Sequence, residues 1–354
     1  MAYSVALPRP HWYPACTSRE LGVRRPRAIS LMGAPLVVFR DGDGRASVLV
    51  DRCPHRNAPL SMGRVRDGAL ECGYHGWRFD GSGGCVGIPG FDDTVDTSAR
   101  RGVGTHATRE RDGIVWFWSE ADETPPPAAE PFAVPDLGPG ARDVVLTYDI
   151  DATMHAAIEN TLDVPHTAFL HRGLLRGAEP NTITARRLAV DGGRGIEVEY
   201  TGEPFGIGFL RRHDGATLEH HDRFFLPSIA QVEYRAGQWL HIVNSVLHLP
   251  LSEFRTRAWF VLRFRSDRLP ARLVESIVRL QGPRVARQDV RMLGLQTATV
   301  RRFGGEQFSS TDLDLFGNAV WRLLRWASTD GNGQGDGDRA APPVIEPREV
   351  TFRA

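Results

Sequence analysis

The segments Cys53-Pro-His55 and Cys72-Gly-Tyr-His75, with sixteen residues between them, are the part of the sequence that decides the fold. Each of these two short loops offers one thiolate and one imidazole. Two cysteines and two histidines bind either a tetrahedral zinc ion or a two-iron cluster that carries both histidines on one iron. Structural zinc sites usually place both cysteines on one turn and both histidines on a helix. Because each loop here supplies one residue of each type, the spacing favours the iron–sulfur cluster.

A second group of metal-binding side chains lies in residues 159–171, Glu-Asn-Thr-Leu-Asp-Val-Pro-His-Thr-Ala-Phe-Leu-His. Residues three apart on a helix share a face, so Asp163 is expected beside His166. Pro165 disfavours helix at the residue before it, and a break there allows His166 and His171 to turn toward one point. Two imidazoles and one carboxylate on one side of an iron leave positions open for dioxygen and substrate.

Both patterns resemble the metal-binding motifs of the Rieske non-heme iron oxygenases. Cys53-Pro-His55-Arg56 with Cys72-Gly-Tyr-His75-Gly-Trp77 is similar to their [2Fe–2S] signature. Asp163-x-x-His166-x-x-x-x-His171 is similar to their mononuclear iron motif. The resemblance implies that Cys53, His55, Cys72 and His75 bind the cluster and that His166 and His171 bind a mononuclear Fe(II).

The resemblance also gives two neighbouring residues a role. It implies that Asp163 is the acidic bridge that hydrogen-bonds a ligand histidine and connects it to the cluster of a neighbouring subunit. A carboxylate at that place fixes the tautomer of the imidazole and provides a polar path for electrons. Asn160 lies three residues before Asp163, as in the monooxygenase-type members. Asn160 either lines the iron site without binding the metal or is an ordinary polar helix residue.

The third iron ligand in this family is an Asp on a long helix near the C-terminus. In Arg287-Gln288-Asp289 we expect Asp289 to be this ligand. The less suitable alternatives are Asp312, Asp314 and Glu275. Family members often have Glu-Asp at this place, whereas this chain has Gln-Asp.

The expected fold class is α+β. An N-terminal Rieske [2Fe–2S] β-sandwich domain (residues 1–125) precedes a linker (126–135), where prolines are frequent. The catalytic domain (136–354) is expected to hold an antiparallel sheet flanked by helices, a helix-grip-like arrangement.

The local pattern of the sequence predicts individual elements. The predicted strands are Pro35–Phe39, Ser47–Val50, Ile114–Trp118, Glu197–Tyr200, Arg223–Leu226, Ile229–Tyr234, Leu240–Leu247 and Ala258–Phe264. The predicted helical segments are Asp151–His171, Leu269–Thr299 and Thr311–Trp326. The expected apolar face of the long helix consists of Leu273, Ile277, Leu280, Val285, Met292 and Leu295. A low-complexity segment, Gly331–Gly337, is expected to be a flexible loop.

Composition is that of an ordinary globular enzyme. The chain has 354 residues, 41% hydrophobic and 24% charged, with a formal net charge of zero, so nothing favours binding to nucleic acid or to an acidic membrane. No signal peptide and no membrane span is visible. A labile cluster requires a reducing compartment, where the four cysteines do not form disulfides. We therefore expect a cytoplasmic protein.

The resemblance implies an oxygenase component, and the expected reaction is hydroxylation or oxidative demethylation of an apolar, ring-containing small molecule with O₂. The chain has no dinucleotide-binding fingerprint, so electrons from NAD(P)H must come through a separate reductase or ferredoxin. The family also implies a head-to-tail homotrimer. Alternatives are a desaturase or ring dioxygenase of the same family, an electron-transfer protein without catalysis, and a zinc-binding interaction protein.

Overall fold

The chain forms two compact units. A computed structural model describes residues 3–91, 101–126, 128–172, 182–203, 218–329 and 341–353. One unit is Arg9–Ala133, and the other joins Met1–Pro8 to Val134–Ala354. The sequence placed the first eight residues in the N-terminal domain, whereas Ser4 N–H donates to Glu306 Oε1 (2.9 Å) in the second unit. The boundary between the units lies within the proline-rich segment that the sequence predicted as a linker.

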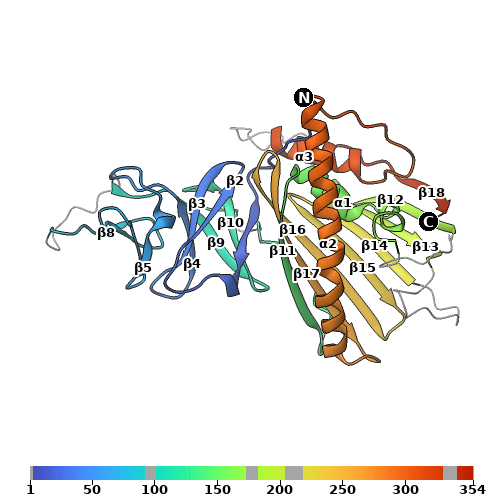
Figure 1. Cartoon of the computed structure of the whole chain (residues 1–354), viewed down its shortest axis with the longest axis horizontal. Coiled ribbons are helices and arrows are strands. Elements are labelled where there is room, and N and C mark those ends of the chain that lie inside the picture. The colour runs from blue at the N-terminus through green and yellow to red at the C-terminus, as the bar shows by residue number, and fades with distance from the viewer. Residues whose placement is uncertain are drawn as a thin grey trace. The chain divides into compact units, whose positions relative to one another are not determined.

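The Arg9–Ala133 unit consists of two antiparallel sheets (Figure 1). The six-stranded sheet has the order β1-β10-β9-β4-β3-β2 and the four-stranded sheet the order β5-β6-β7-β8. The strands of the first are β1 (Trp12–Thr17), β2 (Arg27–Leu31), β3 (Ala34–Arg40), β4 (Ala46–Val50), β9 (Thr105–Arg111) and β10 (Ile114–Ala121). Those of the second are β5 (Arg64–Arg66), β6 (Ala69–Glu71), β7 (Arg78–Phe79) and β8 (Cys85–Gly87). Cys53 and Cys72 pack in one apolar cluster with Leu60 and Phe79, so the core fixes the start of both Cys/His loops.

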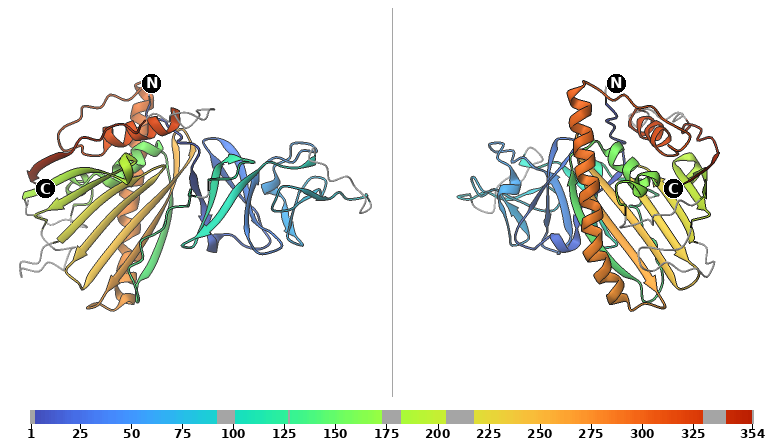
Figure 2. Two further views of the ribbon diagram at one scale, coloured as in Figure 1. Left: turned by 180° about the vertical axis from the view of Figure 1, so that it is seen from behind. Right: turned by 45° about the vertical axis from the view of Figure 1, so that its right-hand side comes forward.

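The second unit is built on one antiparallel sheet of eight strands, in the order β11-β17-β16-β15-β14-β13-β12-β18. The strands are β11 (Arg142–Ile150), β12 (Thr182–Val190), β13 (Gly195–Thr201), β14 (Leu218–Phe225), β15 (Ile229–Ala236), β16 (Leu240–Ser252), β17 (Arg255–Ser266) and β18 (Arg348–Arg353). The helices are α1 (Met154–Leu162), α2 (Ala271–Arg302) and α3 (Gly317–Thr329). Figures 1 and 2 show α2 lying along one face of this sheet. The α+β class predicted from the sequence is confirmed.

The register of the sheet decides which side chains face α2. Opposite residues of an antiparallel pair lie on the same face. Leu262 is opposite Val144 on one neighbouring strand and Asn244 on the other, and Leu262 packs in the apolar cluster that contains Val274 of α2. The row through these residues therefore faces the helix.

The helices depart from the sequence prediction in two respects. The predicted apolar face of α2 is wrong, because Leu280 and Leu295 are 58% and 55% exposed whereas Ala286 and Leu293 are buried. Apolar residues occupy more than one side of this helix. The side that packs against the rest of the unit carries Ala286 and Leu293, not the residues that the sequence suggested. The last helix begins at Gly317 rather than at Thr311, since Asp314 accepts hydrogen bonds from Thr311 and holds that segment in a turn.

The predicted strands fall on strands of the structure, with Leu226 alone lying beyond the end of β14. The Gly331–Gly337 segment lies outside the described residues. In the described part of the chain, no helix is both long and apolar enough to cross a membrane.

Candidate metal centres

The two Cys/His loops share one backbone geometry although their sequence spacings differ. Each cysteine N–H donates to the carbonyl five residues further on, at 2.9 Å for Cys53 and 2.8 Å for Cys72. Each cysteine carbonyl accepts from the N–H four residues further on, at 2.8 and 3.0 Å. That fourth residue has a positive φ in both loops, 61° at Asn57 and 71° at Gly76. Asn and Gly are the residues that tolerate this conformation best, so both loops are sequence-encoded.

The four predicted cluster ligands meet at the ends of these loops. Cys53 and Cys72 are each 2% exposed, and their thiols are hydrogen-bond partners. The rings of His55 and His75 lie 4.5 Å apart between centroids. Trp77 stacks on His55 at 4.8 Å with an interplanar angle of 5°. Two thiols side by side in the core and two imidazoles side by side nearer the surface match the ligand division of a Rieske cluster.

The protonation of the loops is also consistent with bound iron. Burial raises the pKa of the Cys53 thiol to about 11, so the site needs a metal to hold a thiolate there. His55 Nδ1 is buried and has no hydrogen-bond partner among the described residues. The donor set therefore fits a [2Fe–2S] cluster.

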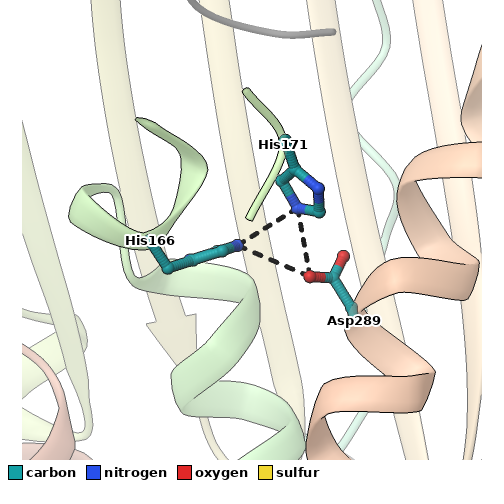
Figure 3. Close-up of side chains that lie close together, drawn as sticks. All are labelled: His166, His171 and Asp289. Atoms are coloured by element: carbon teal, nitrogen blue, oxygen red, sulfur yellow. Dashed lines mark hydrogen bonds and ion pairs between the residues drawn. The ribbon is translucent and has the colours of Figure 1, made fainter. Parts of the chain in front are cut away.

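The second constellation brings three predicted iron ligands together (Figure 3). His166 lies in a 3₁₀ turn (η4, Pro165–Ala168), His171 follows it, and Asp289 projects from α2. His171 Nε2 is 3.3 Å from His166 Nε2 and 3.0 Å from Asp289 Oδ1. His166 Nε2 is 3.5 Å from the same carboxylate oxygen. Ligands about 2 Å from one metal ion lie about 3 Å from each other, so the set can hold one ion.

The break that the sequence predicted before Pro165 produces this convergence. Helix α1 ends at Leu162, Asp163 has an extended backbone, and Pro165 begins the 3₁₀ turn. His171 is 1% exposed, while His166 is 19% exposed. Burial opposes the charged form of His166, but Asp163 and Asp289 outweigh it and raise its pKa to about 9. The two carboxylates therefore concentrate negative charge where a metal cation would lie.

A contact across the unit fixes the tautomer of His171. Gln288 Oε1 is 2.8 Å from His171 Nδ1. An amide oxygen can only accept, so His171 Nδ1 carries the proton and Nε2 keeps the lone pair that a metal requires. Sequence reasoning treated Gln288 only as a departure from the Glu-Asp of the family. Its place beside Asp289, in the same turn of α2, was the signal that could have identified it.

Asp163 lies beside the ligand His166, and Asn160 lies in the last turn of α1, three residues before Asp163. Asp163 Oδ2 is 3.4 Å from His166 Nδ1, although the geometry is poor for a hydrogen bond. Asp163 and Asn160 both line a hollow of about 470 Å³ between α1, α2 and residues 307–318. Glu159, which sequence reasoning did not single out, lines it too, and burial together with Asp163 and Asp314 raises its pKa to about 7. The hollow is thus lined by several acidic side chains, and Asp163, the residue predicted to connect the two metal sites, is one of them.

Comparison with known proteins finds a family match in each half of the chain. Residues 11–98 match the Rieske [2Fe-2S] domain family, and residues 150–327 match the vanillate O-demethylase oxygenase C-terminal domain family. The oxygenase component of dicamba O-demethylase from Stenotrophomonas maltophilia is 35% identical over 46% of this chain and 47% of its own length. Protein TIC 55 of Arabidopsis thaliana, a chloroplastic protein, is 32% identical over 45% of this chain and 30% of its own length. The chain thus spans less than half the length of these curated relatives.

The fold has a solved counterpart. The crystal structure of dicamba monooxygenase bound to dicamba superimposes with a TM-score of 0.77, at 23% identity, over 92% of this chain and 98% of the other. The two family matches occur in the order that the motifs predicted and together extend over both units. The chain belongs to the Rieske non-heme iron oxygenases, as an oxygenase (alpha) subunit.

Proposed function

We propose that this protein is the oxygenase component of a system that hydroxylates or oxidatively demethylates an apolar, ring-containing small molecule. It uses O₂ and electrons that a separate reductase or ferredoxin delivers from NAD(P)H. The observation that carries the proposal is the convergence of His166 Nε2, His171 Nε2 and Asp289 Oδ1 on one point. A ferrous ion held by two imidazoles and one carboxylate supplies dioxygen activation.

The residues around that point have separate tasks. His166, His171 and Asp289 hold the ion, and Gln288 keeps His171 in the tautomer that presents Nε2. Asp163 positions His166 from the other side. Asn160 lines the acidic hollow next to Asp163 and contributes a neutral polar group there.

Asp163 would also lie on the path by which electrons pass from the cluster of a neighbouring subunit to His166 and the ion in a homotrimer. The cluster loop presents an exposed edge, with Tyr74 67% exposed, on which another chain could dock. Exposed apolar side chains also lie along α2 and just after η4, for example Leu280 and Phe169, which is 85% exposed. Large exposed apolar groups of this kind are typical of protein interfaces. A ring of identical chains would cover them and close head to tail.

The names of relatives support demethylation. The C-terminal family is named for vanillate O-demethylase oxygenase, and a relative is the oxygenase component of dicamba O-demethylase. Another relative is the oxygenase subunit of 3-chlorobenzoate-3,4-dioxygenase, so ring dihydroxylation is the competing outcome.

The test combines the purified protein with a surrogate reductase, NADH, O₂ and a panel of methoxylated and N-methylated ring compounds. Mass spectrometry should detect a product that has gained one oxygen or lost a methyl group, and Asp289→Ala should give none while its cluster is still reduced. Glu275→Gln, on the same helix but in an exposed pair with Arg279, is the matched control and should remain active. If O₂ reoxidises the reduced clusters of wild type and Asp289→Ala at the same rate, and neither protein transforms any compound, the protein only transfers electrons.

A further inference from the structure

The carboxylate of Glu159 has no cationic or hydrogen-bonding partner in the described part of the chain. It lines the hollow of about 470 Å³ that Asp163 and Asp314 also line. Burial and the charges of Asp163, Asp314 and Glu306 all raise the pKa of Glu159, to about 7. A half-buried acid whose charged neighbours are all acids is unfavourable, so the hollow favours a positively charged occupant.

The wall of the hollow offers a further hydrogen-bond acceptor. His155 forms part of this wall and is only 6% exposed. Its Nε2 donates to Gly317 O at 2.9 Å, because a carbonyl oxygen can only accept, so Nδ1 keeps the lone pair. That Nδ1 is buried and has no partner among the described residues. No arginine is among the described residues that line the hollow, so its chemistry is that of an acceptor site for a cationic donor.

The arrangement of the acids suits an organic cation better than a metal ion. Among the described residues, only His166, His171 and Asp289 bring three ligand atoms within 4.8 Å of one another. A metal ion needs ligands about 2 Å away, whereas a guanidinium carries five N–H donors on a plane and can reach acceptors that lie further apart. The chain contains no Lys, so a side chain of another copy that fits the hollow must be an Arg.

The first cluster loop carries an arginine without an acidic partner. Arg56 directly follows His55 and is exposed. Its backbone N–H hydrogen-bonds the sulfur of Cys53, which fixes this residue beside the cluster site. Its guanidinium has no ion-pair or hydrogen-bonding partner in the part of the chain that the structure describes. Arg64 of the same unit, in contrast, pairs with Glu71 at 2.7 Å.

We propose that Arg56 of a neighbouring copy of this chain enters the hollow and forms an ion pair with Glu159, which holds the neighbour's cluster beside Asp163. The inference rests on the proposed function, because that function brings the neighbour's cluster to Asp163, and Asp163 lines the same hollow. Arg56 is adjacent to His55 and arrives there together with the cluster. Glu159 is thus a positioning residue, and each half of the pair supplies the charge that the other lacks within its own chain.

Exposed apolar side chains accompany both halves of the pair. Phe308 lines the hollow and is 56% exposed. Tyr74 and Met62, in the unit that carries Arg56, are 67% and 78% exposed. Contact between these groups would exclude water around the ion pair, and a shielded ion pair is stronger than one at an open surface.

The test measures how tightly copies of the complete iron-loaded protein associate, by sedimentation over a range of concentrations. Arg56→Gln and Glu159→Gln should each weaken association about 10- to 100-fold, because either change leaves one charge without its partner. The double variant should be no weaker than the weaker single variant, since both changes remove the same ion pair. The reversed pair, Arg56→Glu with Glu159→Arg, should recover part of the affinity. Arg64→Gln, whose ion pair lies within its own chain, is the matched control and should associate like wild type.

Several results would overturn the inference. They are additive effects in the double variant, wild-type affinity in either single variant, and a wild-type protein that stays monomeric. Variants that lose the cluster or unfold are recognised by their absorbance spectrum, and the wild-type protein then decides alone. Its association should weaken severalfold between about 50 mM and about 500 mM NaCl, because salt screens charge pairs. Association that does not depend on salt would contradict the ion pair.

The two proposals fail in different experiments. If the enzyme oxidises ring compounds while the Arg56 and Glu159 variants associate like wild type, only the ion pair is wrong. If the two residues are coupled in association but no compound is ever oxidised, only the oxygenase function is wrong.

Discussion

At the scale of single residues, the sequence predicts those site residues whose positions depend on short spacings along the chain. His166, His171 and Asp163 lie within nine residues of one another, and Pro165 announces the backbone break that brings the two histidines together. Gln288 could not be assigned in the same way, because its contact with His171 joins residues 117 apart in the chain.

The role of Asp163 is tested by Asp163→Asn. The amide keeps the size of the side chain but removes the charge that supports the imidazole of His166. We expect both metals to remain bound, while reoxidation of the reduced cluster by O₂ slows about 10- to 100-fold. Stopped-flow absorbance of the cluster measures this rate. Asp312→Asn, an exposed acid outside the ligand group, serves as the control, and an unchanged rate in Asp163→Asn would exclude Asp163 from the electron path.

At the scale of elements, the strands were predictable and their partners were not. Alternation and turn residues identify β13 to β17 locally, but β18 pairs with β12 across more than half of the unit, and no local pattern predicts that. The contact face of α2 escaped prediction because its sequence offers apolar residues on several sides. Which of these sides is buried depends on how α2 packs against the rest of the unit.

The inner part of the sheet also contains a buried ion group that determines how stability changes with pH. His220 contacts Glu203 Oε2 with Nδ1 (2.8 Å) and Asp222 Oδ1 with Nε2 (2.9 Å). The rings of Tyr200 and Tyr234 stack on its two faces. Burial opposes the imidazolium, but Asp222 and Glu203 outweigh it and raise the pKa of His220 to about 9. The folded state therefore binds this proton more tightly than the unfolded state does.

The sign of the pH dependence follows from linkage. The stability that charged His220 contributes is complete below its ordinary pKa of about 6.5 and is lost as pH rises through about 9. His220→Phe should lower the free energy of unfolding by about 3–5 kcal/mol near neutral pH, because two carboxylates lose their partner. Chemical denaturation should show that this difference between wild type and variant shrinks between about pH 6 and pH 9.5. A constant difference would mean that His220 is neutral in the folded protein, and His221→Gln, on the opposite face, is the control.

At the scale of the whole molecule, the order of motifs predicted the order of units. The cluster loops lie in Arg9–Ala133 and the iron ligands in the unit that includes Val134–Ala354. The return of Met1–Pro8 to the second unit could not be predicted, since it depends on the contact between Ser4 and Glu306. Oligomeric state is likewise a property that one chain's sequence pattern does not encode.

The proposed homotrimer predicts a mass three times that of the 39.2 kDa chain in light scattering at micromolar concentration. Replacing the exposed apolar residues Leu280 and Leu295 of α2 by Gln should weaken assembly, because the interface loses buried apolar area. Val23→Gln, at a residue that is 68% exposed in the other unit, is the matched control. A wild-type protein that stays monomeric would require electron transfer within one chain.

The central claim is that one chain binds a cluster and a separate mononuclear iron. Iron and acid-labile sulfide analysis, combined with Mössbauer spectroscopy of the reduced protein, tests it most directly. We predict about three irons and about two sulfides per chain, with a high-spin Fe(II) signal distinct from the cluster that disappears in Asp289→Ala. About two irons per chain, with the same spectrum in wild type and Asp289→Ala, would contradict the account.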